Sequence, residues 1–150
     1  MGYRTVTPGR RTLGAGIEHD EGSVLLLTLG YVLLALAVIF VCVCATDLYI
    51  AQKRLDALAD SAALAGADGF TLVVRDGGAR AELTDAGVEE QAASLVVAVP
   101  GDASLTAAGT PDGVTARVTV AAQWHPPLVS LFVPDGVPLE STATSRTALR

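Results

Sequence analysis

Residues 24–46 have the sequence VLLLTLGYVLLALAVIFVCVCAT, a run without a single charged side chain. As an α-helix this run would reach about 34 Å, slightly more than the roughly 30 Å of hydrocarbon in a bilayer. Backbone amides find no water there, so a segment that crosses lipid must be helical. In a soluble protein, a charge usually breaks the apolar run of a core helix within about 10–14 residues. The run therefore predicts a membrane-spanning helix with modest tilt.

The composition fits a chain shared between membrane and water. Its 150 residues are 51% hydrophobic and 17% charged, which allows one span and one small domain. No second run approaches about 18 apolar residues, so we predict a single pass. The predicted fold class is α+β, with a long N-terminal transmembrane helix that continues into an amphipathic helix, followed by a small extracytoplasmic domain with an antiparallel sheet. The predicted segments are a flexible cytoplasmic leader (1–22), the transmembrane helix (23–46), the amphipathic juxtamembrane helix (47–69) and the extracytoplasmic α+β domain (70–150).

The charges around the span bear on its orientation. Three arginines precede it, and Lys53 and Arg54 follow it closely, so the positive-inside rule alone is nearly balanced. A short leader without a hydrophobic pattern has little reason to cross, whereas a long acidic segment after a first span is readily translocated. We therefore expect a cytoplasmic N-terminus at the cell membrane. The net charge of −6 lies after the span, which argues against nucleic-acid binding.

The next question is whether a peptidase removes the leader or the apolar run from the mature protein. The apolar run is far longer than the roughly 7–15 apolar residues of a secretory signal. Gly22-Ser23 would suit a prepilin-type cleavage site, but such sites usually carry Glu at the fifth position after the cut, where this chain has Leu27. We therefore expect the leader to stay attached. Cys42 and Cys44 lie inside the run and are expected to act as small apolar side chains.

The segment after the span continues the helical pattern. Residues 47–69 contain no proline and are dominated by Ala and Leu, and Gly66 and Gly69 offer places to stop. At 100° per residue, mostly small apolar side chains share one face, which we call the small-residue face. The predicted helix-packing interface on it consists of Ala51, Leu55, Ala59, Ala62 and Gly66. Small side chains let a second helix or a sheet approach the backbone closely. That partner is either the chain's own domain or another molecule, and the sequence leaves both open.

The same segment carries a family resemblance. A polar leader and a long apolar span are followed by Asp47 and then by RLDALADSAALAGA, residues 54–67. This sequence resembles the N-terminal region of TadE/TadG-type proteins, which belong to the tight-adherence (Flp) pilus assembly systems of bacteria. The resemblance covers about residues 19–69. Asp60 and residues 62–67 match the family pattern, so the resemblance implies that Asp47 and Asp60 are the polar residues of the motif.

Two positions depart from the family pattern, since Asp56 stands where Gln is usual and Leu58 where Ala is usual. The resemblance implies a non-enzymatic single-pass component of a pilus or secretion assembly, either a pseudopilin-like or an assembly or anchoring subunit that acts through helix packing. The implied partners are membrane lipid and other membrane proteins of that assembly, or a second copy of the chain. The alternative is a membrane-anchored extracytoplasmic ligand-binding or sensor-like module, for which the short leader leaves no room for an output domain.

Residues 70–150 predict a compact α+β unit. A short apolar run at 70–75 is ended by a turn at 76–78. The expected elements after it are a helix from Thr84 or Asp85 to before Pro100, strands at 104–109 and 114–124 joined by a turn at 110–113, and a strand from 137 to about 147. Residues 114–124 alternate between inward and outward positions, which is typical of a half-buried strand, and put Trp124 at its inward end. A unit of this size buries only a marginal core, so we expect helix 47–69 to lie against the sheet.

No pattern in the sequence predicts catalysis. His19 lies in the leader, and neither it nor His125 has a partner at metal-ligand spacing. Asp56 and Asp60 are one helical turn apart and could bind a cation or act as an acid/base pair, but the nearby Lys53 favours two solvated carboxylates. We therefore expect no enzyme activity, no cofactor, no metal, no small-molecule substrate and no nucleic acid.

Overall fold

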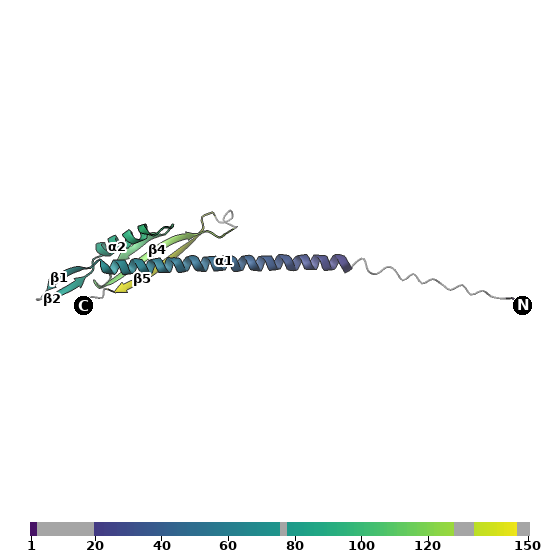
Figure 1. The fold of residues 1–150 in the computed structure, drawn as a ribbon, viewed down its shortest axis with the longest axis horizontal. Helices are drawn as coiled ribbons and strands as arrows, with labels where there is room; N and C mark the ends of the chain where they lie inside the picture. Colours follow the sequence, from purple (N-terminus) through teal and green to yellow (C-terminus); the bar gives the residue numbers. More distant parts are fainter. Residues whose placement is uncertain (3–19, 76–77, 128–133, 147–150) are drawn as a thin grey trace. The chain divides into compact units, whose positions relative to one another are not determined.

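The computed structural model describes residues 1–2, 20–75, 78–127 and 134–146. Residues 3–19 of the leader, whose flexibility the sequence predicts, lie outside this part of the chain. Contacts divide the chain into two units, Met1–Val41 and Cys42–Arg150. Helix α1, Asp20–Asp68, begins in the first unit and ends in the second (Figure 1).

Helix α1 exposes apolar side chains throughout its first half. Within the part of the chain that the structure describes, α1 is long and apolar enough to cross a membrane. No residue of its most apolar 18-residue stretch is buried. The hydroxyl of Thr28 donates to the carbonyl oxygen of Val24 at 3.0 Å, and that of Thr46 to Cys42 at 2.8 Å. Because these hydroxyls are satisfied within the helix, they are compatible with a lipid environment. The predicted long apolar helix, continuing past residue 46 without a break, is confirmed.

The domain after α1 combines one short hairpin with a larger sheet. Its elements are β1 (Thr71–Arg75), β2 (Gly78–Glu82), α2 (Asp85–Ala98), β3 (Ser104–Gly109), β4 (Thr115–Trp124) and β5 (Val137–Arg146). β1 and β2 pair antiparallel with each other, whereas β3, β4 and β5 form an antiparallel sheet with β4 in the centre (Figure 1). The predicted α+β class with an antiparallel sheet is confirmed.

Strand β2 is an element that the sequence analysis does not predict. Its sequence, GARAE, contains no β-branched or aromatic residue and so has low strand propensity. It pairs along its whole length with β1, from Thr71 opposite Glu82 to Arg75 opposite Gly78. The strand therefore forms because the TLVVR sequence of β1 offers it an edge, and not through its own propensity.

Local side-chain chemistry sets the ends of the other elements. The Thr84 side chain caps α2, accepting a hydrogen bond from the backbone three residues on at 3.2 Å. In the β3–β4 turn, Asp112 Oδ1 accepts from the backbone nitrogens of Val114 at 3.0 Å and Thr115 at 2.6 Å. These hydrogen bonds hold the pKa of Asp112 below its ordinary value, and the bond from the Val114 backbone has the largest effect. Gly113 supplies the positive φ of 75° that closes the turn.

The core lies between α1, α2 and the β3–β4–β5 sheet. Its buried members are Leu55, Ala59, Ala62, Ala63, Ala67, Leu83, Val88, Ala92, Val96, Ala116, Val118, Val120 and Ala143. The alternation along β4 is as expected, and helix 47–69 lies against the sheet. Trp124 continues this inward face at the end of β4: it is half-buried, and its indole N–H donates to a carboxylate on α1.

Candidate functional site

The small-residue face of α1 is buried inside the chain's own domain. Ala59 and Ala62 are 0% exposed and Leu55 is 4% exposed, while Gly66 is buried and Ala51 is half-buried. The structure thus gives this face an intramolecular partner, one of the two alternatives that the sequence left open. Another molecule would reach these residues only if α1 detached from the sheet.

Glycines set the distance between α1 and its neighbours. A Cβ atom at Gly66 would lie 2.9 Å from Cγ1 of Val88 on α2 and 3.5 Å from Cβ of Ala116 on β4. Just past the end of α1, a Cβ at Gly69 would lie 2.8 Å from the carbonyl oxygen of Gly87. Because interiors are close-packed, a side chain at either glycine would force α2 away from α1.

Hydrogen bonds at the edges of the small-residue face also join α1 to the sheet, and together we call them the polar seam. The seam consists of the bonds from Trp124 Nε1 to Asp47 Oδ2 (2.8 Å), from Gln52 Nε2 to the carbonyl oxygen of Glu140 (3.2 Å) and from Ser141 Oγ to Asp56 Oδ1 (2.8 Å). Asp47 and Gln52 lie nearer the apolar end of α1, and Asp56 follows one turn later. The seam therefore fixes the rotation of α1 about its own axis relative to the sheet.

Asp56 is the centre of the seam. Besides the bond from Ser141, its Oδ1 accepts from Gln52 Nε2 at 3.0 Å and its Oδ2 from Lys53 Nζ at 3.0 Å. These donors, with Lys53 foremost, hold the pKa of Asp56 below its ordinary value of 3.8. The hydrogen bond between Lys53 and Asp56 also raises the pKa of Lys53 above its ordinary value of 10.5. The sequence analysis anticipates the contact with Lys53 but misses Ser141.

The lowered pKa of Asp56 predicts a loss of stability in acid. The folded state favours the carboxylate, so its contribution is present above pH 3.8 and is lost as the pH falls through the lowered pKa. We expect the urea midpoint of the chain in detergent micelles, followed by tryptophan emission, to fall on acidification below pH 3.8. Asp56→Asn should show a smaller acid-dependent fall, because its side chain does not titrate. An equal fall in the variant and the wild type would contradict this role.

The remaining predicted residues lie apart from this interface. Asp60, the second polar residue of the motif, is exposed on α1, and His125 is exposed after β4. Cys42 and Cys44 carry free thiols. Within the described ranges, no group of three or more His, Cys, Asp and Glu side chains is placed to hold a metal ion. His19 lies outside the described residues.

Comparison with known proteins identifies the N-terminal region. Residues 22–69 match the family model described as "Putative Flp pilus-assembly TadE/G-like". This segment is nearly all of α1, so it includes both the exposed apolar part and the part that packs on the sheet. No curated protein and no solved structure gave a match. The N-terminal region is therefore TadE/G-like, as the motif at residues 54–67 predicted.

Proposed function

We propose that this chain, with its TadE/G-like N-terminal region, is a non-enzymatic single-pass membrane component of a bacterial tight-adherence (Flp) pilus assembly. The observation that carries the proposal is that the family match, residues 22–69, coincides with the single helix α1, Asp20–Asp68. In the assembly the chain acts as a pseudopilin-like or anchoring subunit through helix packing. The ligand-binding or sensor-like alternative is not favoured, because the matched family is one of pilus assembly.

The exposed apolar part of α1 supports both anchoring and helix packing. We call residues 24–43 the apolar half; large hydrophobic side chains are exposed along it from Val24 to Val43. Soluble monomers rarely expose a contiguous apolar surface of this extent, so lipid tails or the helices of other subunits must cover it. The small-residue face is already occupied by the chain's own domain. We therefore place the contact with other subunits in the apolar half.

The surroundings of Asp56 support a structural role in place of a catalytic one. As an acid/base pair, Asp56 and Asp60 would need carboxylates free to exchange protons with a substrate. The Asp56 carboxylate is engaged instead by Lys53, Gln52 and Ser141. Its bond from Ser141 holds the helix to the sheet, which is what an anchoring subunit requires.

The proposed orientation places the N-terminus in the cytoplasm and the domain after α1 outside it. A protease added to spheroplasts should then remove the Trp124 region and spare the leader, because only the former is exposed to the medium. Epitope tags at the two ends of the chain are detected by immunoblotting after protease treatment with and without detergent. Each tag shows on which side of the membrane its end lies. A C-terminal tag that is protected until detergent is added would contradict this orientation.

Photocrosslinking in cells tests the proposed contact. A photoreactive amino acid at Leu33, in the apolar half, should form adducts with membrane proteins of the Flp assembly or with a second copy of the chain, identified by mass spectrometry. Leu64 is the matched control, because both side chains are 59% exposed but Leu64 lies on the part of α1 that belongs to the domain. Protein adducts from Leu64 with none from Leu33 would mean that partners dock on the domain, against the proposal.

A further inference from the structure

Strand β4 runs antiparallel to the second half of α1. Near the start of β4, Cβ of Ala116 lies 3.5 Å from where a Cβ of Gly66 would be, and at its end Trp124 bonds to Asp47. From residue 47 to 66 an α-helix rises about 28 Å, and from 116 to 124 a strand rises about 27 Å. Because these lengths agree, β4 follows the helix closely and ends level with Asp47.

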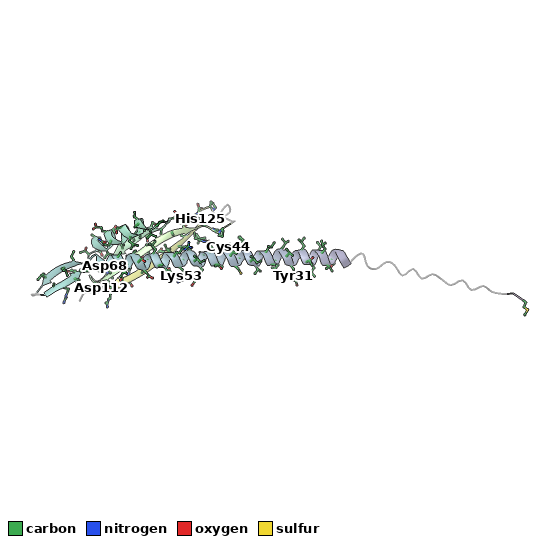
Figure 2. All side chains as sticks on the ribbon, viewed as in Figure 1. Tyr31, Cys44, Lys53, Asp68, Asp112 and His125 are labelled. Carbon is green, nitrogen blue, oxygen red and sulfur yellow. The ribbon has the colours of Figure 1, made fainter. Side chains whose placement is uncertain are left out.

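Asp47 marks the boundary of the span. It is the first charged residue after the uncharged run of residues 24–46. In an anchored helix such a carboxylate lies at the lipid–water boundary, because hydrocarbon disfavours charge. Trp124 Nε1 is 2.8 Å from Asp47 Oδ2, so the indole lies at the same level. Figure 2 shows His125, the next residue, between Lys53 and Cys44 along the length of α1 and well away from Asp68.

The side chains at this level suit a lipid headgroup region. Trp124 is half-buried, and its ring combines an apolar surface with one polar N–H, the combination that favours tryptophan at membrane interfaces. Its pairing partner on β5, Val137, is 38% exposed. Two residues after Asp47, the exposed ring of Tyr49 adds a second aromatic side chain of the kind enriched at membrane interfaces.

We propose that the end of the β4–β5 ribbon, formed by Trp124 and Val137, sits in the lipid headgroup region as a second membrane contact of the chain. This inference rests on the proposed membrane anchoring. The bond from Trp124 to Asp47 holds the ribbon end at the point where α1 leaves the bilayer, so the domain stays docked on the membrane. Residues 128–133, LVSLFV in the sequence, lie outside the described residues, and no part of this surface is assigned to them.

The single tryptophan of the chain makes this contact measurable without a substitution. The full chain is reconstituted into phosphatidylcholine/phosphatidylglycerol vesicles that carry bromine either near the glycerol or near the end of the acyl chain. We expect a large loss of Trp124 emission with the shallow bromine and a smaller loss with the deep bromine. Flotation of the same vesicles measures anchoring separately. A chain that floats but keeps its full emission with both lipids overturns the headgroup contact alone, whereas a chain that does not float overturns the membrane anchoring as well.

A relocated tryptophan provides the matched control. In a Trp124→Phe background, Leu72→Trp places the indole at an exposed position on β1, beyond the end of α1 at Asp68. This variant should float equally well and be insensitive to both brominated lipids. Equal quenching at the two positions would overturn the assignment to the ribbon end. Emission from Trp124 that neither brominated lipids nor aqueous iodide reduce would mean that protein, such as a second copy, covers the indole, and would also overturn it.

Discussion

Replacing Ala62 with leucine is expected to lower the free energy of unfolding of the domain by about 1–3 kcal/mol. Ala62 is 0% exposed and lies in the core cluster that joins α1, α2 and the sheet. The extra carbons of leucine find no space there unless α1 moves away from its neighbours. Since folded proteins are stable by only about 5–15 kcal/mol, this is a substantial share of the total.

Urea denaturation of the full chain in detergent micelles, followed by tryptophan emission, measures this loss. Ala57→Leu is the matched control, because the same substitution is made at an exposed position of the same helix and should change stability by less than about 0.5 kcal/mol. Equal midpoints for the two variants would contradict the burial of the small-residue face. If Ala62→Leu kept its midpoint but lost the crosslinks formed from Leu33, the face would serve as a docking surface for another molecule.

The double substitution Leu34→Arg and Val38→Arg is expected to remove most of the chain from the membrane. Each arginine near the centre of a membrane-spanning helix costs about 2.5–3.5 kcal/mol in insertion, and these two side chains lie in the exposed apolar half. Leu64→Arg is the control, because this residue is equally exposed but lies in the domain. Carbonate extraction followed by immunoblotting measures the membrane fraction. Retention of the double variant in that fraction would mean that the apolar half is not the anchor.

The elements that sequence alone predicts are those with local causes. The span follows from an unbroken uncharged run, and the β3–β4 hairpin follows from the Asp112-Gly113 turn beside an alternating strand. Strand β2 has no such local cause. Its alanines and glycine disfavour a strand, and only pairing with β1 makes it one. Alternation correctly places Trp124 on the inward face of β4, but it does not say where the core ends along the strand or that the indole bonds to Asp47.

The candidate site is likewise predictable from the sequence only in part. Helical periodicity predicts which α1 residues share the small-residue face, but it says nothing of what covers them. The partners come from far along the chain: Asp47 and Trp124 are 77 residues apart, and Asp56 and Ser141 are 85 apart. No local pattern marks Ser141 as a partner for a helix carboxylate. Such contacts depend on how the sheet docks on the helix, which only the three-dimensional structure gives.

The number of Flp pili per cell, counted by electron microscopy, tests the proposed role most directly. The strain lacking this chain is compared with the same strain carrying the wild type, the variant with Leu34→Arg and Val38→Arg, or Leu64→Arg. We expect the deletion to remove the pili, the wild type and Leu64→Arg to restore them, and the double variant to fail, because assembly requires the anchored helix. Wild-type numbers of pili in the deletion strain would contradict a role in Flp pilus assembly.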